Sequence, residues 1–174
     1  MTILGWESKY RDILKEFGYS RKEDSHSCEL LNLLLTEKTR TAAIKDLIEN
    51  KPVFVVGAGP SLLSCIPILK KYKKITKIIA DGAVRAIIEN GLRPDIVVTD
   101  LDGDINALKK TGRTNTIMLV HAHGDNPDKL YLVKNFKNCI GTTQTKQTRR
   151  IHNFGGLQTE IGVCFWLITL KPKK

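Results

Sequence analysis

The sequence has few cysteines, few aromatic residues and no long apolar run. Its four cysteines are scattered without a CxxC pair, which is typical of reduced thiols in a cytoplasmic protein and not of a disulfide framework. Because no apolar run reaches the length of about eighteen residues that a membrane span needs, we expect no transmembrane helix. The opening "MTILGWESKYRD" becomes charged too early for a secretory signal.

Positive charge is in excess, with 28 lysines and arginines against 18 aspartates and glutamates. This balance favours anionic partners, either nucleic acid or phosphorylated small molecules. The densest basic cluster, "KKYKK" at 70–74, falls where a helix is expected to end, and cations there suit the helix dipole. Aromatic residues make up only 6% and do not interleave with the basic ones. We therefore expect a small-molecule partner with no nucleic acid and no membrane, and a nucleic-acid-binding module stays an alternative. A homo-oligomer stays open.

The 174 residues are enough for one domain with a real core. Residues 1–50 carry leucines at helical spacings, so we expect a helical N-terminal region that acts as a packing cap or an interface. In residues 51–156, short apolar runs alternate with helix-like segments. The runs are "PVFVVG", "TKIIAD", "DIVVTD", "NTIMLVHAH" and "NCIGTT". The pattern predicts an α/β fold with a mostly parallel, Rossmann-like sheet and flanking helices.

Polar signatures follow the five predicted strands, each at the point where its strand ends. They read "GAGPS", "DGA", "DLDGD", "HAHGDN" and "TTQTKQT". In an open parallel sheet the ligand lies beyond the carboxyl ends of the strands. We therefore expect the five signatures to converge on one site in an α/β nucleotide-binding catalytic core.

Glycine-containing turns follow the first two predicted strands. In "GAGPS", Gly57 and Gly59 permit close backbone approach to a phosphate, and Ser61 offers a helix cap or a hydroxyl donor. The turn is neither a full GxGxxG motif nor a P-loop, so a purely structural turn stays an alternative. Asp81 and Gly82 stand where dinucleotide enzymes often place the acid that binds a ribose, which makes an NAD-dependent oxidoreductase an alternative function.

Two carboxylates follow the third predicted strand in "PDIVVTDLDGD". Asp100 and Asp102 are two residues apart, and in an extended segment such residues point the same way. Two hard oxygen ligands, together with phosphate oxygens and water, suit Mg²⁺. We expect Asp104 instead to cap the next helix.

The fourth signature permits two interpretations. His121 and His123 also share a face and could bind zinc, although no third ligand is evident. Asp125 suits either the N-cap of the following helix or a further carboxylate at the metal site, where it is also our candidate general base.

The last signature offers hydroxyls and basic side chains. Thr143, Lys146 and Arg149 form a composition suited to holding a triphosphate. A plain basic loop is the alternative.

Taken in order, these motifs are similar to those of the archaeal 6-hydroxymethyl-7,8-dihydropterin pyrophosphokinases, whose core resembles the thiamin pyrophosphokinase catalytic domain. The similarity rests on "VVGAGPSL", "DGA", "PDIVVTDLDGD", "HAHGDN", "GTTQT" and "HNFGG". It implies Mg²⁺-dependent transfer of diphosphate from ATP to the hydroxymethyl group of the pterin, with release of AMP. By motif position it implies that Asp100 and Asp102 hold the metal, and that the "GAGPS" and "DGA" turns contribute to the nucleotide and substrate pocket.

Residues 157–174 depart from this family pattern, which continues after "HNFGG" with a phenylalanine and an acidic TDGDR stretch. One base lost near the codon for Gly156 would account for the difference, since the restored frame permits that motif and an amphipathic helix after it. We therefore hypothesise a frameshifted, shortened and aberrant tail that impairs activity. Resequencing the gene tests this hypothesis.

Overall fold

The computed structural model describes residues 5–35 and 41–154, and it begins with three helices. They are α1 (Trp6–Phe17), α2 (Arg21–Leu34) and α3 (Thr41–Ile48). A glycine with a left-handed backbone conformation flanks each end of α1, with φ of 78° at Gly5 and 68° at Gly18. The hydroxyl of Ser20 caps α2 by accepting a hydrogen bond from the amide of Glu23. The predicted helical N-terminal region is thus present where the chain is described.

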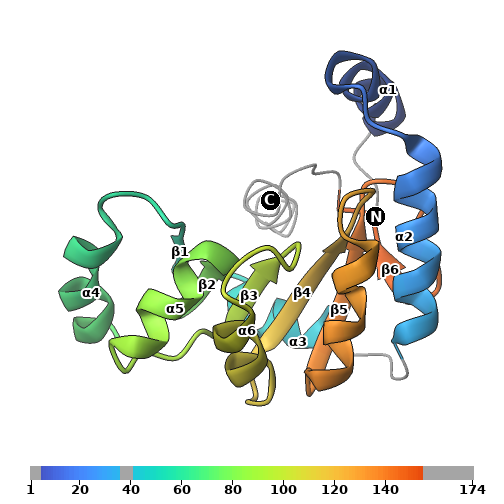
Figure 1. Ribbon diagram of the computed structural model, residues 1–174. Helices are drawn as coiled ribbons and strands as arrows, with labels where there is room; N and C mark the ends of the chain where they lie inside the picture. Colours follow the sequence, from blue (N-terminus) through green and yellow to red (C-terminus); the bar gives the residue numbers. More distant parts are fainter. Residues whose placement is uncertain (1–4, 36–40, 155–174) are drawn as a thin grey trace.

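Six parallel strands form one sheet in the order in which they occur in the chain (Figure 1). They are β1 (Val53–Val56), β2 (Thr76–Ala80), β3 (Ile96–Thr99), β4 (Ile117–Ala122), β5 (Asn138–Thr143) and β6 (Ile151–His152). The mostly parallel sheet with flanking helices is confirmed, and β6 was not expected. The strand order nowhere reverses, so the carboxyl ends of all six strands lie along one continuous edge of the sheet.

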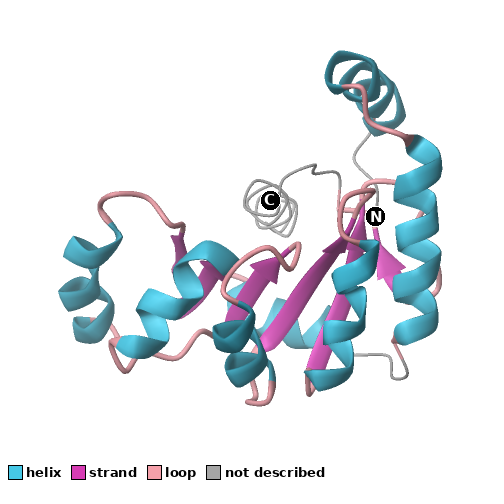
Figure 2. Ribbon diagram, in the orientation of Figure 1, coloured by secondary structure: helices cyan, strands magenta, loops and turns pink. Residues whose placement is uncertain are grey.

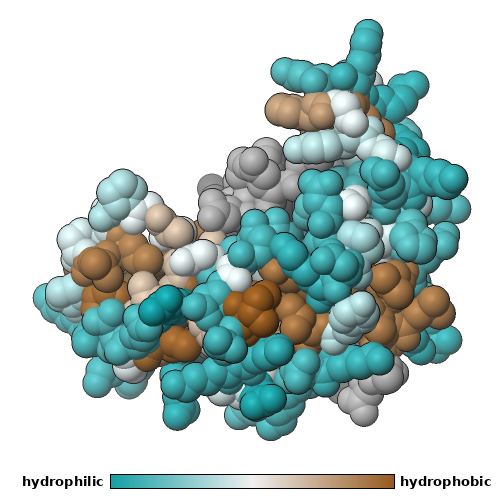
Figure 3. All heavy atoms as spheres, in the orientation of Figure 1, coloured by the Kyte–Doolittle hydropathy of each residue, from teal (hydrophilic) through white to brown (hydrophobic). Residues whose placement is uncertain are grey.

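Helices follow the first four strands (Figure 2). They are α4 (Leu62–Lys71), α5 (Asp81–Glu89), α6 (Ile105–Gly112) and the 3₁₀ helix η1 (Pro127–Asn135). α4 ends within the basic cluster, as predicted. Its exposed apolar side chains, Leu63 and Ile68, belong to the region where Figure 3 shows brown surface over α4. No helix of the described residues is long and apolar enough to cross a membrane.

Alternating side chains of the strands build two apolar layers. On one face, Ile79 and Met118 pack with α2, α4, α5, α6 and η1. On the other face, Ile78 and Leu119 pack against Ile44 of α3. Because successive residues of a strand point to opposite faces and helices cover both faces, β2 and β4 are buried along their whole length. Even the polar side chains of Thr76 and Lys77 in β2 are buried. The sheet is therefore rigidly held beneath the loops at its carboxyl edge.

Candidate active site

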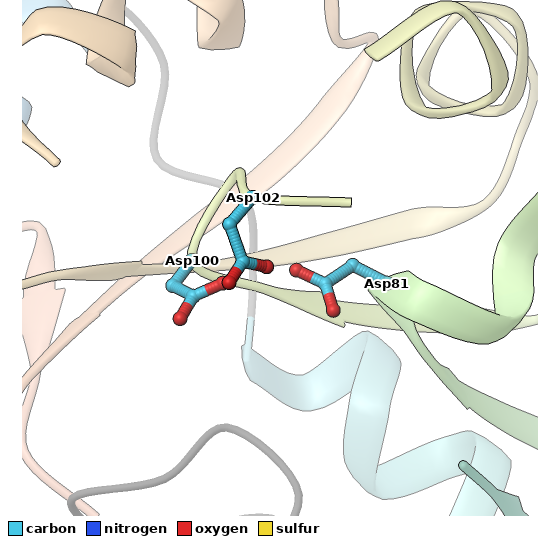
Figure 4. Close-up of side chains that lie close together, drawn as sticks. All are labelled: Asp81, Asp100 and Asp102. Atoms are coloured by element: carbon cyan, nitrogen blue, oxygen red, sulfur yellow. The ribbon is translucent and has the colours of Figure 1, made fainter. Parts of the chain in front are cut away.

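Three carboxylates meet at the carboxyl edge of β2 and β3. Asp81 is the first residue of α5, whereas Asp100 and Asp102 belong to the loop after β3. Figure 4 shows the three side chains facing one another, and one oxygen of each lies within 4.8 Å of the others. The sequence predicted two of these residues as metal ligands and Asp81 as cofactor-binding. The structure brings all three together, and this is the one such group of three potential metal ligands within residues 5–35 and 41–154.

The loop after β3 is not extended, so our reason for placing Asp100 beside Asp102 was wrong. Leu101 between them is fully buried and has a φ of 71°, in the left-handed region that leucine seldom adopts. Its amide donates to Oγ1 of Thr99 (2.8 Å), and the same hydroxyl donates to Oδ2 of Asp81 (3.0 Å). Thr99 therefore fixes both the tight turn and the third carboxylate.

Two glycines allow the loops around the carboxylates to touch. A Cβ atom at Gly103 would lie 2.9 Å from the carbonyl oxygen of Asp81, which is too close for any other residue. A Cβ atom at Gly82 would lie 3.1 Å from Cβ of Ala58, in the turn after β1. Gly103 therefore lets the loop after β3 pack against the start of α5. Gly82 lets the predicted phosphate-binding turn after β1 pack against the same helix.

The crowded carboxylates alter one another's protonation. Burial raises the pKa of Asp81 to about 7, and Asp100 and Asp102 add to that rise. The contact with His123 holds the pKa of Asp100 well below its usual range. The neighbouring Asp100 in turn raises the pKa of Asp102. Since like charges repel and a hard divalent cation prefers carboxylate oxygens, this donor set fits Mg²⁺.

A cavity of about 340 Å³ opens beside Asp100 and Asp102. Its walls come from α2 and the residues before it, from the loop after β4, and from the ends of β3 and β5. It is lined by Tyr19, Ser20, Glu23, Asp24, Asp100, Asp102, His123, Gly124, Asp125, Asn126, Lys129 and Gln144. The volume is of the size that holds a small ligand.

His121 of β4 and His123 just after it do not form a zinc site with a third ligand in the described part of the chain. Burial lowers the pKa of His121 to about 4, and its Nδ1 contacts Oγ1 of Thr142 at 3.0 Å. Nε2 of His123 lies 3.7 Å from Asp100, and Nδ1 lies 3.8 Å from Asp125. His123 therefore belongs to the carboxylate site, and His121 to the core beneath it.

Asn126 connects the loop after β4 to the loop after β3, which carries Asp100 and Asp102. Its Nδ2 donates to the carbonyl oxygens of Asp100 (2.7 Å) and His121 (2.8 Å), and its Oδ1 accepts from the amide of His123 (3.1 Å). Asn126 is also the residue that precedes η1, so the suggestion that Asp125 is the N-cap was wrong. Asp125 instead lines the cavity and faces His123.

The N-terminal helices contribute directly to the site, which the sequence analysis missed. Asp24 of α2 is buried and accepts from the amide of Gly124 (2.7 Å), from Nε2 of Gln144 (2.7 Å) and from the hydroxyl of Tyr10. Nε1 of Trp6 donates to the carbonyl oxygen of Gln144 at 2.8 Å. These bonds fasten α1 and α2 to the loops after β4 and β5.

One sequence signal pointed to this role. Asp24 lies four and seven residues before Cys28 and Leu31, so it falls on the apolar stripe of α2. An acid in that position is buried on folding and needs donors, which the loops after β4 and β5 and the hydroxyl of Tyr10 supply. Gln144 and Lys129, by contrast, sit in ordinary polar segments and carried no such signal.

Asp104 caps α6 through the amide of Ala107 (2.8 Å), as predicted.

Several of the predicted nucleotide-binding residues lie outside the cavity lining. Thr143 is buried and contacts Oγ1 of Thr145 at 3.1 Å. The remaining predicted residues are Gly57, Gly59 and Ser61 after β1 and the exposed Lys146 and Arg149 after β5. Residues 155–174, on which the frameshift hypothesis rests, lie outside the described residues.

Comparison with known proteins gives consistent matches. The family described as 6-hydroxymethylpterin diphosphokinase MptE-like matches residues 29–173. Three curated relatives are each named 6-hydroxymethyl-7,8-dihydropterin pyrophosphokinase. The protein from Methanocaldococcus jannaschii is 39% identical over 187 residues, covering 100% of this chain and 77% of the relative. The protein from Pyrococcus furiosus is 46% identical over 155 residues, covering 87% of this chain and 65% of the relative.

The third relative, from Methanothermobacter thermautotrophicus, is 37% identical over 161 residues, covering 90% of this chain and 68% of the relative. The chain therefore spans between 65% and 77% of the lengths of these three proteins.

Proposed function

Because the chain belongs to the MptE-like 6-hydroxymethylpterin diphosphokinase family, we propose that it transfers diphosphate from ATP to 6-hydroxymethyl-7,8-dihydropterin and releases AMP. The observation that carries the proposal is the group of three carboxylates, two of which line a cavity of about 340 Å³. A diphosphotransferase needs a cation site and an acceptor site side by side, and this arrangement offers both.

In this proposal Asp81, Asp100 and Asp102 hold Mg²⁺. The ion would neutralise the phosphate charges that otherwise repel an incoming hydroxyl. The pterin hydroxyl oxygen attacks the β-phosphorus, the bond from that phosphorus to the bridging α–β oxygen breaks, and AMP departs with that oxygen. Asp125 lines the cavity and is the proposed acceptor of the hydroxyl proton. Lys129 also lines it and offsets the negative charge near Asp102.

The other predicted nucleotide contacts support binding of ATP beside the cavity. The turn from Gly57 to Ser61 is in reach of α5 through the contact at Gly82, which favours a role at the phosphates. Lys146 and Arg149 are exposed after β5, and we propose that they stabilise the charge on the departing AMP. We also propose a cytoplasmic location, which the scattered cysteines without a CxxC pair favour.

The test is to incubate the purified chain with ATP, Mg²⁺ and 6-hydroxymethyl-7,8-dihydropterin and to separate the nucleotides by chromatography. We expect AMP to form in step with the pterin diphosphate. ADP as the product would contradict diphosphate transfer, and so would the absence of any turnover.

Asp100→Asn tests the metal-binding residues in the same assay. We expect it to lower kcat by at least about a hundredfold, because it removes a charged ligand from the ion that neutralises ATP. The matched control is Asp46→Asn, an exposed acid on α3 outside the cavity lining, which should retain full activity. Normal turnover by Asp100→Asn would remove this residue from the proposal.

The oxidoreductase alternative has no comparable support. All three curated relatives are named pyrophosphokinases. The acid that suggested ribose binding, Asp81, faces two other carboxylates.

A further inference from the structure

The cavity beside the carboxylates has a second wall, formed by α2 and the residues just before it. We propose that this wall is the recognition surface for the acceptor, and that Glu23 binds the 2-amino and N3–H edge of a pterin ring. The inference rests on the proposed function, and it names which residues of the same site read the substrate.

Glu23 lines the cavity, and its carboxylate has no partner among the described residues. Its Oε2 atom lies 3.5 Å from the position that a Cβ atom would take at Gly124, so it sits over the loop after β4. Among the described residues the Glu23 carboxylate has no hydrogen bond or ion pair, although its backbone amide is bonded to Ser20. The carboxylate of the next residue, Asp24, accepts hydrogen bonds from Gly124, Gln144 and Tyr10. Of these two neighbouring acids, Glu23 is the one available to a ligand.

A free carboxylate suits one edge of a pterin. The 2-amino group and N3–H of the 4-oxo ring present two parallel N–H donors. An ionised carboxylate has two acceptor oxygens and no donor, so it can accept both bonds in a bidentate pair. Such a pair fixes the plane of the ring as well as its position.

A buried amide side chain lies beside the two acids. Gln144 is 3% exposed, its Nε2 donates to Asp24, and its Oε1 has no hydrogen-bond partner in the described part of the chain. The Oε1 atom is enclosed by the protein, and His121 is its neighbour in the core. Gln144 therefore holds Asp24 beneath the cavity and leaves Glu23 as the carboxylate that a ligand can reach.

An aromatic wall completes the surface. The ring of Tyr19 lines the cavity and stacks on Phe17, with ring centroids 5.7 Å apart. A flat heterocycle can stack on such a face. Since Asp100 and Asp102 line the same cavity, a ring held at Glu23 keeps its hydroxymethyl group within the space that the metal-binding residues border.

The test compares Glu23→Gln with Glu29→Gln, the same substitution at an exposed position of α2 outside the cavity lining. Direct binding of 6-hydroxymethyl-7,8-dihydropterin is measured by titration calorimetry without ATP, and KM is measured for both substrates. We expect Glu23→Gln to weaken pterin binding by about 10- to 100-fold, the effect of losing a charge-assisted hydrogen bond, and to leave the KM for ATP unchanged. Glu29→Gln should bind like the parent chain. Equal pterin affinity in the two variants would overturn the inference.

A second ligand identifies the edge that is read. The 2-oxo analogue, 6-hydroxymethyl-7,8-dihydrolumazine, lacks the 2-amino donor. The parent chain should bind it more weakly than the pterin, whereas Glu23→Gln should bind the two ligands alike. A preference for the pterin that survives in Glu23→Gln would overturn the assignment to Glu23 and leave the proposed function standing. If the parent chain neither binds nor converts the pterin, the proposed function itself fails.

Discussion

His121 is a titratable side chain that the fold keeps neutral. Burial in the core beneath the carboxylate site lowers its pKa from 6.5 to about 4. Because the folded pKa lies below the unfolded one, the unfolded chain binds more protons between these values. The stabilisation that comes from keeping His121 neutral is complete above pH 6.5 and is lost as the pH falls toward about 4.

His121→Asn tests this linkage. An asparagine amide can replace Nδ1 in the contact with Thr142 but does not titrate. The free energy of unfolding is measured at pH 7 and pH 4 by urea denaturation with EDTA present. Between these pH values the parent chain should lose about 3 kcal/mol more stability than the variant. The control His26→Asn, at an exposed histidine of α2, should keep the pH dependence of the parent. Parallel curves for the parent and His121→Asn would contradict the argument.

Gly103 and Leu101 show why single positions of the site escaped prediction. The need for glycine at position 103 arises from its contact with Asp81, which is distant in the sequence. In the same way, the left-handed backbone of Leu101 depends on its buried side chain and on Thr99. Such requirements come from contacts between loops, and local pattern does not contain them.

At the scale of elements, α2 joins the N-terminal helices to the site. Its Asp24 bonds to the loops after β4 and β5, and α2 packs against η1, β4 and β5. The sequence predicted the helix but treated it as a cap, because only the folded arrangement brings Asp24 to Gly124 and Gln144. The helices of the N-terminal region therefore support the loops after β4 and β5.

Asp24→Asn measures this support. The amide loses the charge and presents an N–H group toward partners that are themselves donors, so buried hydrogen bonds are lost. We expect a loss of about 3 kcal/mol in the free energy of unfolding, observed by urea denaturation, together with a weaker affinity for the pterin. The matched control is Asp12→Asn, an exposed acid on α1, which should unfold like the parent. A variant as stable as this control would show that Asp24 does not anchor α2.

The longer strands were easier to predict from the sequence than the helix type or the short last strand. β2, β3 and β4 are buried along their length, and their continuous apolar runs identified them. The segment after β4 was expected to be an α-helix, and residues Pro127–Asn135 form a 3₁₀ helix, a tighter form that the apolar spacing did not distinguish. β6 has only two residues, too few to leave a pattern.

At the scale of the whole molecule, the sheet brings its functional residues to one edge. The prediction that polar signatures converge at the strand ends holds for Asp81, Asp100, Asp102, His123 and Gln144, which meet at the carboxylates or the cavity. It followed from chain direction alone, because parallel strands end at the same edge. The second wall of the cavity comes from α2, outside the predicted catalytic core, and no rule about the sheet could supply it.

The central claim is that Asp81, Asp100 and Asp102 hold a divalent cation, and paramagnetic NMR with Mn²⁺ tests it most directly. In ¹⁵N-labelled protein, substoichiometric Mn²⁺ should broaden the amide signals of Gly82, Leu101 and Gly103 first, because these amides adjoin the three carboxylates. Asp100→Asn should remove this selective broadening, whereas Asp46→Asn should keep it. Selective broadening elsewhere in the chain, or a pattern unchanged by Asp100→Asn, would contradict the claim.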